Sequence, residues 1–103
     1  MDYPFIPIHP GEILKEELET RGISQKQLSE LMGIPYTMFN EILNCKRPLS
    51  TEMALMFEAA LDINADMLCN MQSQYNMQSA RQNVTLSDRF KAIRKVCAAA
   101  YLL

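Results

Sequence analysis

The sequence predicts an all-α protein of five short helices followed by a C-terminal amphipathic helix. Three observations carry this prediction. Apolar residues recur every three or four positions along nearly the whole chain, as they do on one face of a helix. Serine, asparagine, proline and glycine stand where such segments would begin and end. No segment alternates apolar and polar residues as a half-buried strand does.

The first two helices are bounded by residues that favour helix starts and stops. Pro10 suits the first turn of a helix that Gly22 ends. Ser24 is expected to cap a second helix, because Gln27 follows three residues later as in a capping box. Gly33 then stops this helix after barely two turns. The spacing therefore predicts two short helices joined by a tight turn to whatever follows.

The next three helices are indicated in the same way. Pro35 suits the first turn of a third helix, and Ser50 or Thr51 is expected to cap a fourth. Asn64 can cap a fifth helix, which the apolar spacing extends from 65 to about 75. A compact bundle of short helices is therefore expected over residues 1–76.

Residues 77–86 are polar and lack a helical period, so they are predicted to be a linker before a last helix at 87–103. Four residues of that helix repeat at intervals of 3, 4 and 3, an a/d-type stripe: Phe90, Ile93, Cys97 and Ala100. We expect this stripe to form a homodimer seam or to bind a partner. The alternative is that the helix folds back onto its own bundle, as most amphipathic helices do.

Charge divides the chain into segments. The formal net charge is −2, which argues mildly against a nucleic-acid binder. Residues 1–78 carry 5 basic and 11 acidic side chains, whereas residues 79–103 carry 5 basic and 1 acidic. Between residues 24 and 50 the balance returns to +1, with 3 basic and 2 acidic side chains. A local DNA-binding surface is therefore compatible with the acidic total.

The composition points away from several other classes of protein. The apolar fraction of 49% suits a globular domain, and no apolar run approaches a membrane span. The opening residues have no basic start and contain three prolines, so a secretory signal is not expected. We therefore expect a cytoplasmic location. Three scattered cysteines and a single histidine, His9, predict neither a metal site nor a disulfide framework. Neither a nucleophile–base pair nor a phosphate-cradling glycine loop is present, so neither an enzyme nor a cofactor is expected.

Residues 24–44 carry the most informative spacing. A capped short helix, a glycine-led turn and a second short helix form the helix-turn-helix arrangement. Gly33 permits the left-handed backbone that lets two helices meet at a steep angle. The residues expected to hold the pair together are apolar: Leu28, Leu31, Ile34, Phe39 and Ile42. A plain αα-corner in a helical bundle would show the same pattern.

The polar residues around this motif suit DNA. The outward side of its second helix carries amide, hydroxyl and carboxylate groups that can meet base edges in a major groove: Tyr36, Thr37, Asn40, Glu41 and Asn44. Gln25, at the start of the preceding helix, can offer its side chain and free backbone N–H groups to a phosphate. Lys46 and Arg47, past the end of the second helix, can hold the backbone on the other side.

A longer run resembles the XRE class of phage-repressor-type helix-turn-helix proteins, and more narrowly the HigA antitoxins. The run is HPGEILKEELETRGISQKQLSELMGIPYTMFNEILNCKRPLSTEMALMFEAAL. The narrower resemblance rests on HPGEILKEEL before the motif, on ILNxKRPLS after it and on NMQSQYNM near its end. It covers roughly residues 9–77.

The resemblance implies a five-helix phage-repressor-like DNA-binding domain in a dimeric antitoxin. Such proteins bind a HigB-type ribosome-dependent mRNA endonuclease and repress their own operon at a palindromic operator. Carried over by position, the recognition helix would use Pro35, Tyr36, Thr37, Asn40 and Glu41. Ser24 and Gln25 would contact phosphate, and Lys46 and Arg47 would form the basic loop. The acidic residues Glu12, Glu16, Glu17 and Glu19 would be either a surface for a basic toxin or a solvated helix face.

Two alternatives stay open at this stage. One is a solitary XRE regulator without a toxin, and the other is a helical interaction module that does not bind DNA, which the net charge favours. The chain also departs from the family at Cys45, where glycine is usual, at Leu68, where an aromatic residue is usual, and in its basic tail. Cys45 either adopts a left-handed conformation, at a cost of about 1 kcal/mol, or leaves that turn to Asn44.

Overall fold

A computed structural model describes residues 7–101. They form six helices and no strand: α1 (Pro10–Arg21), α2 (Gln25–Leu31), α3 (Tyr36–Leu43), α4 (Thr51–Leu61), α5 (Ala65–Gln82) and α6 (Val84–Tyr101). The all-α prediction is therefore confirmed for this part of the chain. Residues 1–6 of the predicted first domain and residues 102–103 of the predicted last helix lie outside the described residues.

The helix starts follow from local capping. Ser24 caps α2, Ser50 caps α4 and Asn64 caps α5, each by accepting a hydrogen bond from the backbone N–H three residues later. These three predicted starts are confirmed. At α1 the cap is His9, whose Nδ1 accepts from the N–H of Gly11 at 2.9 Å. Each cap satisfies a backbone donor that the first turn of a helix leaves free.

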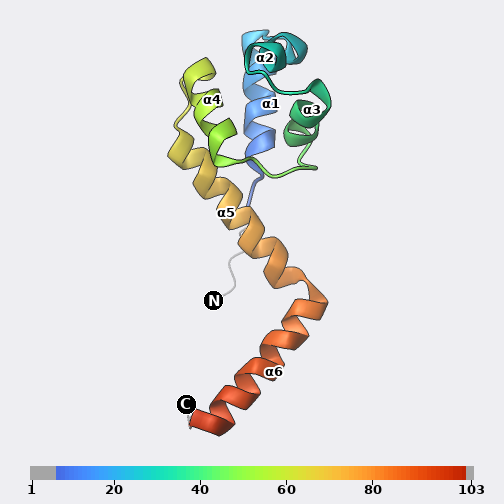
Figure 1. Cartoon of the computed structure of the whole chain (residues 1–103), viewed down its shortest axis with the longest axis vertical. Helices are drawn as coiled ribbons and strands as arrows, with labels where there is room; N and C mark the ends of the chain where they lie inside the picture. The colour runs from blue at the N-terminus through green and yellow to red at the C-terminus, as the bar shows by residue number, and fades with distance from the viewer. Residues whose placement is uncertain (1–6, 102–103) are drawn as a thin grey trace.

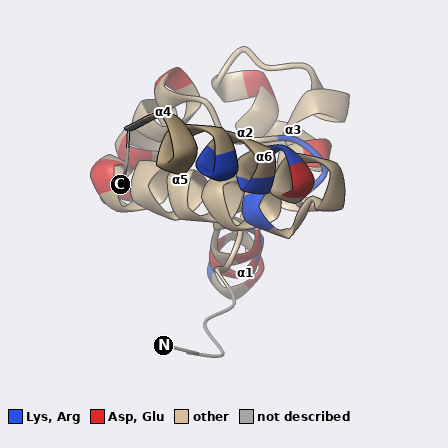
Figure 2. Cartoon of the chain, turned by 90° about the horizontal axis from the view of Figure 1, so that it is seen from below, with Lys and Arg blue, Asp and Glu red and all other residues tan. Residues whose placement is uncertain are grey.

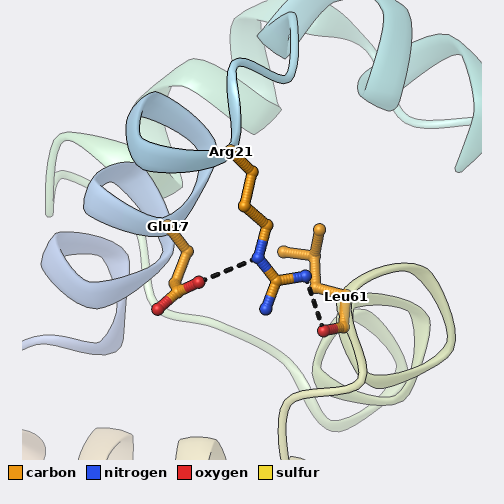
Figure 3. A network of polar contacts seen from close by, with 3 residues as sticks. All are labelled: Glu17, Arg21 and Leu61. Carbon is orange, nitrogen blue, oxygen red and sulfur yellow. Dashed lines mark hydrogen bonds and ion pairs between the residues drawn. The ribbon is translucent and has the colours of Figure 1, made fainter.

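Helices α1 to α4 and the first part of α5 enclose the core (Figure 1). The rings of Phe39 and Phe57 lie at its centre, with centroids 5.6 Å apart. Arg21 fastens the end of α1 to the end of α4: its Nε donates to Glu17 at 2.9 Å and its Nη1 donates to the carbonyl of Leu61 at 2.8 Å (Figure 3). The core thus holds the helix-turn-helix against two neighbouring helices.

One predicted core residue lies outside. Leu31 was expected to pack between α2 and α3, but 85% of it is exposed. The buried side of α2 passes through Leu28 and the small Ser29, whose hydroxyl donates to the carbonyl of Lys26. Two positions after Ser29, a residue on a helix points about 200° away, so Leu31 faces solvent.

The predicted linker at 77–86 is helical, which corrects that prediction. Helix α5 runs on to Gln82, and only Asn83 breaks the path before α6 begins at Val84, not at 87. The Asn83 side chain accepts from the N–H of Leu86 at 3.0 Å and so caps α6. The segment lacks an apolar stripe because it is exposed, yet it is rich in glutamine, alanine and arginine, which favour helices without any packing.

The end of α5 and the whole of α6 form an arm that extends from the body (Figure 1). The molecule measures 57 × 27 × 21 Å, and its radius of gyration is 18.0 Å. A compact chain of this length would have a radius near ~13 Å. No residue from 84 to 100 is buried, so the structure does not show the alternative in which the last helix packs on its own bundle. Among the described residues, none of the helices has the length and apolar character needed to cross a bilayer.

Candidate nucleic-acid interface

The second helix of the motif, α3, has a buried side and an exposed side. Gly33 turns the chain between α2 and α3 at φ +69°, and Pro35 stands at the N-cap of α3. Phe39, Ile42 and Leu43 are buried. The predicted base-reading residues lie on the other side: Tyr36, Thr37 and Asn44 are exposed, and Asn40 and Glu41 are half-buried. The geometry thus matches the predicted inward and outward sides of this helix.

A chain of hydrogen bonds links this exposed side to both neighbouring helices. The Asn40 amide donates to Gln25 Oε1 at 3.4 Å, so the start of α2 touches the middle of α3. The Asn44 amide donates to the Asn40 carbonyl and side-chain oxygens at 2.9 and 3.1 Å. Lys15 Nζ of α1 donates to Asn44 Oδ1 at 3.0 Å. These contacts fix the orientation of the two amides.

Lys15 is a residue that sequence reasoning missed. It stands 29 positions from Asn44 and belongs to a helix outside the motif. No local pattern links the two. Its ammonium adds a cation beside the row of amides on α3.

The loop after α3 carries the two predicted phosphate-binding cations. Arg47 Nη2 lies 3.1 Å from Glu41 Oε1, with 44% and 37% of the two side chains exposed. An exposed pair of this kind adds little stability, but it lays Arg47 along α3. Lys46 is exposed. Lys46 is thus open to solvent, and Arg47 lies beside Glu41 of α3.

The turn that carries these cations is built on Cys45. Its φ is +63°, whereas Asn44 has φ −98°, so Cys45 takes the left-handed conformation and Asn44 does not. The N–H of Cys45 donates to the Ile42 carbonyl at 3.1 Å, and that of Lys46 donates to the Glu41 carbonyl at 2.8 Å. This pair of bonds is a Schellman motif, in which glycine is usual at the left-handed position.

The thiol itself is not suited to chemistry. Burial raises the pKa of Cys45, and the negative charge of Glu12 acts in the same direction. The protonated thiol is a poor nucleophile and a poor metal ligand. Cys45 is therefore a structural residue of the turn.

Cys45→Gly is expected to raise the free energy of unfolding by about 1 kcal/mol, because glycine adopts positive φ without the clash of a Cβ. Urea denaturation measures the gain. Cys45→Ala is the matched control, since it removes the thiol and keeps the Cβ, and it should give no gain. Equal stability of the glycine variant and the original chain would show that the turn is not strained.

The stripe expected to pair α6 is uncovered. Phe90 is 37% exposed and Ile93 is 59% exposed, Cys97 is half-buried and Ala100 is exposed. Four of the five cations of the tail lie on α6, whose blue segments Figure 2 shows, and the fifth, Arg81, lies on α5. The four predicted residues thus share one side of an 18-residue helix that its own chain leaves open.

Comparisons with known proteins agree on one kind of domain. The family model described as Helix-turn-helix (HTH_3) matches residues 14–68. Virulence-associated protein I of Dichelobacter nodosus is 34% identical over 77 residues, which are 74% of this chain and 71% of the relative.

Two solved structures from Pseudomonas aeruginosa hold DNA. The antitoxin HigA with the higBA promoter is 31% identical with a TM-score of 0.70, and the match covers 85% of this chain and 91% of that one. The protein PA4674 in complex with its operator DNA (28bp) is 34% identical with a TM-score of 0.67, covering 73% and 84%.

Proposed function

The chain belongs to the XRE-type helix-turn-helix family, and from this premise we propose that it is a homodimeric antitoxin that represses its own operon and neutralises a HigB-like mRNA endonuclease. As a member of this family it is a DNA-binding regulator of the antitoxin type. The operator, the dimer and the toxin are the parts that the proposal adds.

The observation that supports the DNA-binding site is that α3 lies between the start of α2 and the loop after α3, the two places to which we assign phosphate contacts. Ser24 and Gln25 stand at the free N–H groups that begin α2, and Lys46 and Arg47 stand just past α3. Phosphate contacts at both ends fix the register of a helix in the major groove. In this geometry the first residues of α3 enter the groove first.

The assignment of the base-reading side follows from chemistry. Tyr36 and Thr37 are exposed in the first turn of α3, ahead of Asn40, Glu41 and Asn44. Asparagine can donate to and accept from the edge of adenine, a hydroxyl can pair with several bases, and glutamate can accept from cytosine. We assign Pro35 the role of bringing the start of α3 close to the DNA.

The dimer is proposed to form through the α6 stripe, since a palindromic operator needs two α3 helices related by a two-fold axis. Phe90, Ile93, Cys97 and Ala100 would face the same residues of a second copy. The repeat of 3 and 4 is that of a helix that packs against another helix.

The toxin is proposed to be basic, because α1 presents carboxylates. Glu12, Glu16 and Glu19 line a surface hollow of about 510 Å³ together with Lys15 and the end of α3. Opposite charges steer two proteins together and favour the correct partner. A solitary regulator is the second candidate, since binding of DNA by α3 does not require a toxin.

Two experiments test this proposal. The purified chain should shift its own promoter DNA in a gel, and the shift should weaken steeply as salt rises. Co-expression with the neighbouring small basic open reading frame should yield a complex on pull-down. If the DNA shifts while no neighbour encodes a partner and none co-purifies, the solitary regulator is correct and the antitoxin half is wrong.

A further inference from the structure

We call residues 45–49 the basic loop. The side chain of a buried glutamine bonds to the backbone of this loop. Gln72 of α5 is 6% exposed. Its Oε1 accepts from the backbone N–H of Leu49 at 2.9 Å, and its Nε2 donates to Asn76 Oδ1 at 2.9 Å. Both ends of the amide are thus engaged. One end fixes the loop, and the other fixes the amide on its own helix.

A buried histidine, His9, lies beside the same loop. His9 is 3% exposed, and its ring lies edge-on to Tyr75 of α5, with centroids 5.0 Å apart and an interplanar angle of 81°. His9, Arg47 and Gln72 line one small cavity of about 190 Å³. The start of α1 and the middle of α5 therefore meet behind the basic loop.

The start of α1 is also locked to the end of α3. A Cβ on Gly11 would overlap the backbone oxygen of Ile42, so the two backbones are in direct contact there. Gly11 is the residue whose N–H His9 caps. The structure around the basic loop therefore has little room to shift. The backbone of Gly11 contacts that of Ile42, and the Gln72 amide bonds to the backbone of Leu49.

We propose that Gln72 and His9 are positioning residues for phosphate binding: they fix the basic loop so that Lys46 and Arg47 face the DNA backbone. An apolar residue of equal size could fill the space of Gln72, but it would leave the buried N–H of Leu49 without its acceptor. A buried polar group with satisfied partners selects one arrangement of the groups that it bonds. Here that arrangement is the path of the backbone from Arg47 to Leu49.

The same contacts link the loop to the arm. Gln72, Tyr75 and Asn76 lie on α5, the 18-residue helix that continues to the base of α6. A partner bound to α6 is therefore connected through α5, which is one continuous helix, to Gln72 and Tyr75 beside the basic loop. This inference rests on the proposed DNA-binding function, and the test below separates the two.

Gln72→Leu tests the role of the glutamine, because leucine is similar in size and cannot accept from the Leu49 N–H. We expect the affinity for the chain's own promoter to fall about tenfold and the slope of log K against log salt to become shallower by about 1 for each lost phosphate contact. The loss should not add to that of Arg47→Ala, since both changes remove the same contact. Gln72→Glu keeps the acceptor oxygen but loses the N–H that donates to Asn76 and buries a carboxylate, so it should recover only part of the affinity.

Arg21→Gln is the matched control. It removes the part-buried hydrogen bond from Arg21 to the Leu61 carbonyl, which joins α1 to the end of α4 and does not involve the basic loop. It should lower stability and leave the salt slope unchanged. If Gln72→Leu behaves like this control, or if its loss adds fully to that of Arg47→Ala, the glutamine is only structural and the inference is wrong. If the original chain shifts no DNA at all, the proposed function itself fails.

The role of His9 has a separate test through pH. Burial lowers the pKa of His9 below its usual 6.5, against smaller opposing effects of the Arg47 backbone and of Glu12. The titratable or charged residues that share its cavities are Glu12, Cys45, Lys46, Arg47 and Tyr75. The neutral ring accepts from Gly11, and a proton on Nδ1 would remove that acceptor. Because the folded-state pKa is below the unfolded one, the stabilisation is complete above 6.5 and is lost as the pH falls through the folded-state value.

We therefore expect the stability of the original chain to fall as the pH drops below 6.5, and its promoter affinity to fall at the lower pH where the folded-state ring itself takes up a proton. His9→Asn keeps a good cap without a titrating ring, so its affinity should change less over the same range. Non-specific DNA measured in parallel corrects for titration elsewhere. Equal pH slopes in the two proteins would remove His9 from the positioning role.

Discussion

Replacing Tyr36 and Thr37 together with alanine is expected to weaken binding to the chain's own promoter by about 100-fold or more, because each side chain that reads a base edge contributes about 1–3 kcal/mol. Both residues are exposed in the first turn of α3, the part of a recognition helix that enters the groove first. Neither residue belongs to the core, so the variant should fold like the original chain. Fluorescence anisotropy with labelled promoter DNA measures the loss.

The matched comparison is Lys46→Ala with Arg47→Ala. These cations are expected to contact phosphates, so their loss should weaken all DNA alike and make the salt slope shallower by about 2 for each protomer. The alanine pair on α3 should instead spare unrelated DNA. Unchanged promoter binding by the Tyr36 and Thr37 variant would remove both residues from the base-reading role.

Truncation after Gln82 is expected to convert the dimer into a monomer and to lower operator affinity by about 100-fold or more, since two tethered domains bind two half-sites with a high effective concentration. The truncated body retains its helices α1 to α5 and loses no buried residue, because none lies between 84 and 100. Multi-angle light scattering reports the mass directly.

Two substitutions in the full chain separate the stripe from the rest of α6. Ile93→Asp places a carboxylate on the predicted seam, and Lys95→Asp places the same group about 160° away on the helix. The first should produce monomers and the second should not. An intact dimer after truncation, or equal behaviour of the two substitutions, would show that the copies meet elsewhere.

The helix starts were predictable because their causes are local. Ser24, Ser50 and Asn64 each bond a backbone N–H three residues away, so a short window of sequence contains both partners. The left-handed turn was predictable only to within one residue: the sequence left it to Cys45 or to Asn44, and the structure places it at Cys45.

The two wrong predictions, the linker and the burial of Leu31, both concern side chains that are exposed to solvent. The helix between 77 and 82 packs on nothing that would give it an apolar period, so the sequence shows only a polar segment. Leu31 has the spacing of a core residue, yet the buried side of α2 turns toward Ser29 and leaves it in solvent. Periodicity identifies a side that is apolar and does not say whether anything covers it.

The site was predictable only as far as its residues lie within one segment. Residues 24–47 contain the polar row on α3 and both groups that we propose to contact phosphates. The contacts that hold them come from far away: Lys15 is 29 positions from Asn44, and Gln72 is 23 positions from Leu49. Such pairs depend on how whole helices pack, which no local pattern records.

A chemical footprint of the full chain on its own promoter tests the central claim most directly. The account predicts two protected half-sites, related by a two-fold axis and one or more helical turns of about 34–36 Å apart, with protection in the major groove that the Tyr36 and Thr37 variant loses. Uniform weak protection along the DNA, or protection that this variant leaves intact, would contradict the account.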